Sequence, residues 1–276
     1  MQPAVFARTY PGADAAQVLA AVAADGYAAV QFNLQCAGIA SLPDHLPDGL
    51  AEQVAHRARA AGLRIAALSG TYNMAHPDPA ARAQGRAGFA NVVEAARRMG
   101  APVVTLCTGS RDAANLWRAH PDNASPAAWR DLRTELDAAL ELAERAGVCL
   151  GIEPEPANVV RDAVVARRLL DEVGSARLGI VLDAANLLSP ERLPRQHAVM
   201  AEAFALLGGS LLLAHAKDMD AEGRVVGAGQ GAVDLETFVG HLRAVGYDGA
   251  LVGHGFGPED ARSSAVVLRR LCGGAP

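Results

Sequence analysis

Residues 174–186, GSARLGIVLDAAN, decide the fold of this chain. The stretch opens with Gly174, continues as an apolar run rich in branched residues, and closes with Asp183 and Asn186. Glycine is the usual residue just past a helix end, so the stretch predicts a helix end, a buried strand and a polar loop. Because the run has no polar face, it is typical of a parallel strand covered by helices.

The same pattern recurs on both sides of this stretch. Six further glycines each precede a short apolar run: Gly26, Gly62, Gly100, Gly147, Gly208 and Gly246. Their runs are AAVQF, RIAAL, PVVTLC, VCLGIE, SLLLAH and GALVGH, and AVFART opens the chain. At each of these glycines we expect the positive φ that commonly ends a helix.

The segments between the runs have the periodicity of amphipathic helices. The clearest apolar stripe is Phe89, Val92, Val93, Ala96 and Met99. Four side chains have the chemistry and position of helix N-caps, two of them directly before a proline: Asp14, Asp78, Ser125 and Asp234.

Eight such strands alternating with eight helices predict an α/β fold, a (β/α)8 TIM barrel. The chain has 276 residues, a length typical of one such barrel, so we expect a single domain over residues 1–276. An open doubly wound sheet is the alternative. It is less favoured because no G-x-G-x-x-G follows the first run.

Composition excludes several classes of function. The net charge is −5 and no long Lys/Arg run is present, which argues against a nucleic-acid partner. No apolar stretch is long enough to cross a bilayer, and the first residues lack the pattern of a signal peptide. The four cysteines form no C-x-x-C pair, so we expect reduced thiols in a cytoplasmic protein.

Polar residues close the last four runs: Glu153, Asp183, His215 and His254. In this fold the C-terminal strand ends carry the chemistry, so the four side chains should converge at one side of the barrel mouth. All are metal ligands, and together they suit a divalent ion such as Mn²⁺, Mg²⁺, Co²⁺ or Zn²⁺. The alternative for each residue is a helix cap or a salt bridge.

Three neighbours of these residues are further candidates. Glu155 follows Glu153 by two positions and should share its side, where one carboxylate could hold metal while the other moves protons. Lys217 stands in the same relation to His215 and could stabilise an enolate-like oxyanion. Asn186 is a substrate or supporting contact. The alternatives are a cap or an Arg partner for Glu155, and a surface ion pair for Lys217.

Earlier strand ends lead into loops that contain aromatic and basic side chains. Tyr72 and His76 follow the third run, and Arg111 and Trp117 follow the fourth. This mixture suits a polyol, with Trp117 as a stacking wall and Arg111 as a contact for phosphate or carboxylate. The alternative for Trp117 is packing against helices.

Five strings resemble the sugar phosphate isomerase/epimerase family, the xylose isomerase-like TIM barrels. They are SGTYNMAHPD (69–78), GIEPEP (151–156), VLDAANLL (181–188), AHAKD (214–218) and GAGQGAVDLETFVGHLRAVGYDGAL (227–251). The resemblance implies a metal held by Glu, Asp, His and Glu on strands five to eight. Glu153, Asp183 and His215 match, but His254 stands where the family usually has Glu.

The resemblance implies a metal-dependent sugar isomerase or epimerase that works through an enediolate. Glu153 or Glu155 would remove the proton next to the carbonyl. With His254 in place of one glutamate, symmetric ketose epimerisation is less expected than one-base chemistry. A keto-sugar or keto-inositol dehydratase and a non-catalytic sugar-binding barrel are the alternatives. The expected partner is a small sugar, and a homodimer is the candidate assembly.

Overall fold

The computed structural model describes residues 1–274 and contains a closed barrel of parallel strands, as expected. The last two positions of the expected domain, 275–276, lie outside the described residues. The barrel strands are β1 (Gln2–Phe6), β2 (Ala29–Phe32), β3 (Arg64–Ser69), β4 (Val103–Leu106), β5 (Cys149–Ile152), β6 (Leu178–Asp183), β7 (Leu211–His215) and β10 (Ala250–Gly253). They neighbour one another in chain order, and β10 closes the ring against β1. The fold is therefore a (β/α)8 TIM barrel.

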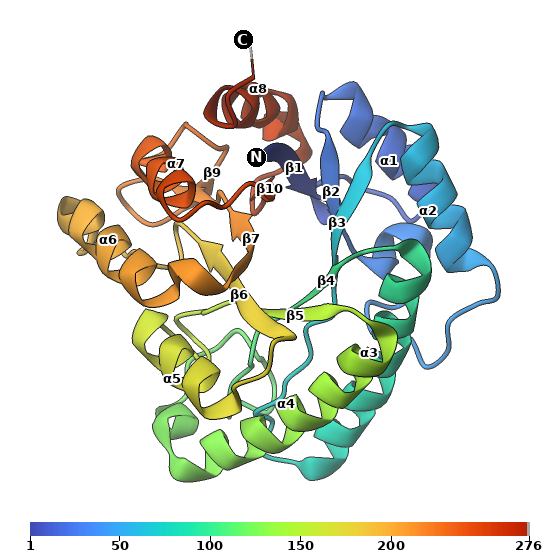
Figure 1. The fold of residues 1–276 in the computed structure, drawn as a ribbon, viewed down its shortest axis with the longest axis vertical. Helices are drawn as coiled ribbons and strands as arrows, with labels where there is room; N and C mark the ends of the chain where they lie inside the picture. Colours follow the sequence, from blue (N-terminus) through green and yellow to red (C-terminus); the bar gives the residue numbers. More distant parts are fainter. Residues whose placement is uncertain (275–276) are drawn as a thin grey trace.

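Helices surround the strands, as Figure 1 shows in a view down the barrel. They are α1 (Ala15–Ala24), α2 (Leu50–Ala60), α3 (Pro79–Met99), α4 (Pro126–Ala146), α5 (Ala163–Val173), α6 (Gln196–Leu207), α7 (Leu235–Ala244) and α8 (Ala261–Leu271). The four predicted N-caps are confirmed, because each side chain accepts a hydrogen bond from an N–H of the first turn.

One predicted helix end differs. Gly100 and Gly147 end α3 and α4 with a φ of +73°, as expected. Gly208 instead has a φ of −54° and continues into a short 3₁₀ turn, Gly208–Ser210, so the prediction of a positive φ there was wrong. Its need for glycine is steric, because a Cβ at this position would lie 2.6 Å from Cγ1 of Val245.

Side chains alternate between two layers along the strands. One layer packs outward against the helices in a large core. A second, smaller cluster is formed mostly by alternate strand residues, except on β3, where Ala66 and Ala67 both belong to it beside a register shift between β2 and β3. The members of the second cluster are Ala4, Ala29, Ala66, Ala67, Val103, Val181, Leu213, Ala250 and Val252. Since successive side chains of a strand point to opposite faces, these residues, mostly alanine and valine, fill the barrel interior.

A short hairpin not expected from the sequence follows β7. It consists of β8 (Asp218–Met219) paired with β9 (Val225–Val226). Asp218 is fully buried and accepts hydrogen bonds from the backbone N–H groups of Gly229 and Gly231, at 2.9 and 3.0 Å. The glycine-rich loop before α7 is therefore folded around a carboxylate of its own chain. A surface ion pair between Lys217 and Asp218 does not form.

The described residues bear on the expectations about membrane-spanning segments and cysteines. Within residues 1–274, no helix combines the length and the apolar character needed to cross a bilayer. All four cysteines are free thiols, and Cys36 and Cys107 are buried.

Candidate functional site

The candidate ligands continue the inward-facing series of their strands. Val181 lies two positions before Asp183, Leu213 two before His215, and Val252 two before His254. Since side-chain direction repeats every two residues, these side chains emerge above the interior layer at the C-terminal end of the barrel. Gly151 of β5 likewise lies two positions before Glu153, which follows the strand.

The four side chains meet in one cluster. One ligand atom from each of Glu153, Asp183, His215 and His254 lies within 4.8 Å of the other three. His215 Nδ1 is 3.2 Å from Glu153 Oε1, and His254 Nε2 is 2.8 Å from Asp183 Oδ2. Burial, with nearby His215, lowers the pKa of His254, which favours the neutral imidazole that binds metal. Two carboxylates and two imidazoles at this spacing fit a divalent ion, so the cluster could hold one.

Asn186 links this cluster to the two other predicted catalytic side chains. Its Nδ2 donates to Glu153 Oε1 and to Glu155 Oε2, both at 3.1 Å, and its Oδ1 accepts from Lys217 Nζ. Lys217 Nζ is also 3.4 Å from Asp183 Oδ2. Asn186 therefore holds both glutamates and the lysine in one network beside the cluster.

Burial and neighbouring charges shift the pKa values of this network in different directions. Burial raises the pKa of Glu155, and Glu153 and Asp183 add to the effect while Lys217 opposes it. Burial alone would lower the pKa of Lys217, but Asp183, Glu153 and Glu155 outweigh it and raise that pKa. Burial likewise opposes ionisation of Asp183, yet Lys217 and the neighbouring imidazoles hold its pKa below the usual range. Lys217 therefore remains a cation beside three carboxyl groups.

Two buried polar residues behind His215 were not predicted from the sequence. His215 Nε2 lies 2.7 Å from Gln31 Oε1, and Gln31 Nε2 donates to Thr105 Oγ1 at 3.2 Å. Because Gln31 presents its carbonyl oxygen, Nε2 carries the proton and Nδ1 is left with a lone pair that faces Glu153. The available signal was a single polar residue inside each of two apolar runs, AAVQF and PVVTLC.

Replacing Gln31 with leucine is expected to weaken divalent-metal binding by about 10- to 100-fold. The change removes the acceptor that fixes the tautomer and orientation of His215. Competition with a fluorescent chelator measures the dissociation constant, and Gln31→Glu, which keeps an acceptor, is the matched control. An unchanged constant in a folded Gln31→Leu protein would show that the contact does not tune the site.

A cavity of about 380 Å³ opens onto the cluster. Glu153, Glu155, His215, Lys217 and His254 line it. The rest of the lining comes from other strand ends and loops: Phe6, Arg8, Gln31, Asn33, Ser41, Ser69, Thr71, Thr105, Cys107, Leu116 and Trp117. The volume accommodates a small polar molecule.

A family model described as the xylose isomerase-like TIM barrel matches residues 19–271. The chain belongs to this family. The match covers all of the barrel except β1 and the start of α1. No curated protein matches the sequence significantly.

Several solved structures share the fold of this xylose isomerase-like barrel. A D-tagatose 3-epimerase-like protein aligns with a TM-score of 0.77 at 14% identity, covering 98% of this chain and 97% of that one. The 3-keto-D-glucoside 4-epimerase from E. coli aligns with a TM-score of 0.76 at 17% identity, covering 98% of this chain and 99% of that one. A D-psicose 3-epimerase from Clostridium cellulolyticum H10 aligns with a TM-score of 0.74 at 14% identity, covering 99% of each chain. At these identities the likeness establishes the fold.

Of the five predicted substrate residues, only Trp117 lines the cavity of this xylose isomerase-like barrel. Asn186 lies in the network that holds Glu155 and Lys217, and the other three bind partners elsewhere. Tyr72 is buried and donates its hydroxyl hydrogen to Glu135 Oε2 at 3.2 Å. His76 turns outward, with Nε2 3.1 Å from the carbonyl oxygen of Ala113. Arg111 pairs with Asp131 instead of facing a ligand, at 2.6 Å.

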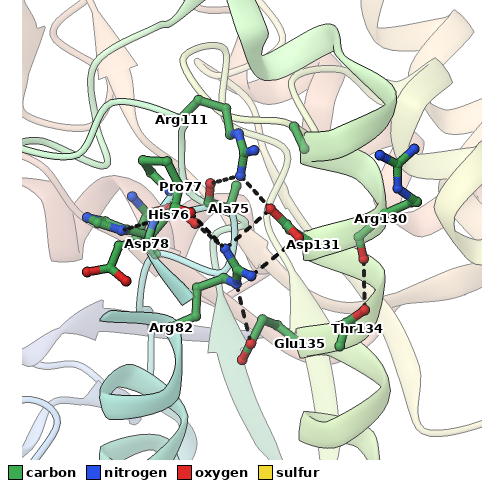
Figure 2. Close-up of polar contacts among 12 residues, drawn as sticks. Ala75, His76, Pro77, Asp78, Arg82, Arg111, Arg130, Asp131, Thr134 and Glu135 are labelled. Atoms are coloured by element: carbon green, nitrogen blue, oxygen red, sulfur yellow. Dashed lines mark hydrogen bonds and ion pairs between the residues drawn. The ribbon is translucent and has the colours of Figure 1, made fainter. Parts of the chain in front are cut away.

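Arg111 belongs to an ion-pair cluster beneath the loops. Figure 2 shows Arg82 and Arg111 converging on Asp131, with Glu135 on the next turn of α4. Arg111 also donates to the carbonyl oxygen of Ala75 at 3.1 Å. The cluster therefore fixes the loop after β3 against the loop after β4, and its arginines are not available to a substrate. Of the four substrate candidates on these two loops, Trp117 alone lines the cavity.

Proposed function

We propose that this protein is a metal-dependent isomerase or epimerase of a sugar or sugar derivative, acting through proton removal next to a carbonyl and an enediolate. One observation carries the proposal. Glu155 lines the same cavity as the metal-ligand cluster but stands outside it, hydrogen-bonded through Asn186 to the cluster residue Glu153. A carboxylate free of the ligand set, beside a Lewis-acid site, is the arrangement that such chemistry needs.

The metal would be held by Glu153, Asp183, His215 and His254. Mn²⁺, Mg²⁺, Co²⁺ and Zn²⁺ all accept this donor set, and a bound divalent ion would supply Lewis-acid polarisation of a substrate carbonyl.

Three side chains do the remaining work. Glu155 removes and returns the proton next to the carbonyl, and its raised pKa suits a group that must hold that proton between steps. Lys217 faces the same cavity as a cation and stabilises the negative charge that develops on the substrate oxygen. Asn186 orients both of them through its hydrogen bonds.

His254 bears on which reaction this is. At the end of β10, where the family resemblance leads us to expect a second glutamate, the chain presents an imidazole 2.8 Å from Asp183 Oδ2. Inversion by two opposed carboxylate bases is therefore less suited to this site than transfer by one base, as in aldose–ketose isomerisation. The names of the aligned epimerases support the substrate class, a sugar or keto-sugar.

Solvent exchange tests the proposal directly. In D2O, the metal-loaded protein should place deuterium on the carbon next to the carbonyl of at least one aldose or ketose in a panel that includes sugar acids. Mass spectrometry detects the label, and prior removal of metal with a chelator should abolish it. If no sugar in the panel takes up deuterium from a fully metal-loaded protein, the proposal is wrong and a binding role replaces it.

A further inference from the structure

The cavity has a second polar region on the side away from Glu155. β1 and β2 lie across the barrel from β5, because three strands separate β1 from β5 in the direction of β10. Arg8 follows β1, while Asn33 and Ser41 follow β2, and all three line the cavity. A molecule that reaches across the cavity from Glu155 meets this group.

Asn33 presents an unused donor to the cavity. The residue is only 4% exposed, and its Oδ1 accepts from Gln35 N and Ser41 Oγ, both at 3.0 Å. Its Nδ2 has no hydrogen-bond partner within residues 1–274. With the oxygen held by two donors, the amide nitrogen is turned toward the cavity that the residue lines. This nitrogen is not among the fully buried polar atoms that lack a partner, so it is open to solvent in the cavity and free to donate to an acceptor there.

Arg8 presents an unpaired cation beside it. Within the part of the chain that the structure describes, no carboxylate lies within 4.0 Å of the Arg8 guanidinium. The inner end of the cavity is different, because one ammonium group and a divalent ion would balance the carboxylates of Glu153, Glu155 and Asp183. Arg8, an exposed residue that lines the cavity, is then the cavity charge that no described residue compensates.

We propose that Arg8 and Asn33 form a subsite for a carboxylate at the far end of the substrate, so that the substrate is a sugar acid. This inference rests on the proposed function and deepens it. Arginine and amide N–H groups suit the two oxygens of a carboxylate, and one guanidinium matches its single negative charge. A phosphate monoester carries more charge than this one cation can neutralise.

Binding of D-gluconate and of sorbitol tests the subsite. The two molecules share a six-carbon polyol chain and differ at one end, where gluconate has a carboxylate and sorbitol a hydroxymethyl group. Calorimetry on the metal-loaded protein should give at least about tenfold tighter binding for gluconate, since hydrogen bonds to a charged group are the stronger kind. Sorbitol 6-phosphate should bind more weakly than gluconate.

Two substitutions locate the effect. Arg8→Gln should lower gluconate affinity by about tenfold and leave sorbitol affinity unchanged. Asn33→Asp keeps the acceptor for Gln35 N but replaces the free donor with a negative oxygen. It should therefore also lower gluconate affinity without changing sorbitol affinity. Arg145→Gln is the charge-matched control, since Arg145 is exposed in the last turn of α4, away from the cavity.

The outcomes separate this inference from the proposed function. The subsite is overturned if gluconate and sorbitol bind with equal affinity. It is also overturned if the preference for gluconate survives Arg8→Gln, which would mean that the carboxylate binds at the metal instead. Tighter binding of sorbitol 6-phosphate overturns the choice of carboxylate. Deuterium exchange into sugar acids at the same rate in Arg8→Gln as in the wild type, together with equal affinity for gluconate and sorbitol, would leave the isomerase intact while removing the subsite. An Arg8-dependent gluconate preference without any deuterium exchange would support the subsite and contradict the proposed isomerase.

Discussion

Asp183→Asn is expected to reduce divalent-metal affinity by more than about 100-fold, a larger loss than the change of a supporting residue produces. Asp183 is 1% exposed, and its Oδ2 lies 2.8 Å from His254 Nε2, 3.4 Å from Lys217 Nζ and 4.0 Å from His215 Nδ1. It is the carboxylate at the centre of the site. The asparagine keeps the shape but removes the negative charge, so a metal ion and the Lys217 ammonium group both lose their counter-charge.

Metal content after dialysis, measured by mass spectrometry, checks this result. Circular dichroism must show that the variant is folded, because Asp183 Oδ1 also accepts from Ala185 N at 2.9 Å. Asp137→Asn, on the exposed face of α4, is the matched control and should retain full metal. One metal ion per chain in a folded Asp183→Asn protein would contradict the ligand assignment.

Glu155→Gln should separate proton transfer from metal binding. We expect solvent deuterium exchange to fall by about 100- to 10,000-fold, the range attributed to a positioned general base, with metal content unchanged. The reason is that Glu155 lines the cavity outside the four-residue cluster. The glutamine can still accept a hydrogen bond from Asn186 Nδ2, so the network geometry should survive while the basic oxygen is lost.

Glu153→Gln provides the comparison. Because Glu153 belongs to the ligand cluster, its substitution should lower metal content and exchange together. The contrast between the two glutamates is the result to look for. Exchange at the wild-type rate in metal-loaded Glu155→Gln would show that another group removes the proton, and Glu153 would be the next candidate.

Much of the site could be predicted because it continues regular structure. On β6, β7 and β10 the ligands follow inward-facing residues by two positions, as Asp183 follows Val181. Strand periodicity sets their direction, and the parallel order sets the end at which they meet. Gln31 and Thr105 obey the same periodicity one layer deeper, but a single polar residue inside an apolar run does not by itself indicate which residue it contacts.

The loop residues followed no such rule. Tyr72, His76 and Arg111 have the chemistry of sugar contacts, yet their polar atoms bind Glu135, the backbone of Ala113 and Asp131 respectively. These partners lie about 20 to 60 positions away in sequence, so no local pattern indicates the pairing. Asn33 and Arg8, which the sequence did not single out, line the cavity instead.

The sequence by itself determined the eight-fold alternation of strand and helix and the four metal-ligand candidates, since both follow from periodicities of two and about 3.6 residues. Tertiary structure alone decided which loop side chains reach the cavity. A loop side chain points wherever its strongest partner lies, and for Arg111 that partner is Asp131 on α4, supplied only when the helices pack around the barrel.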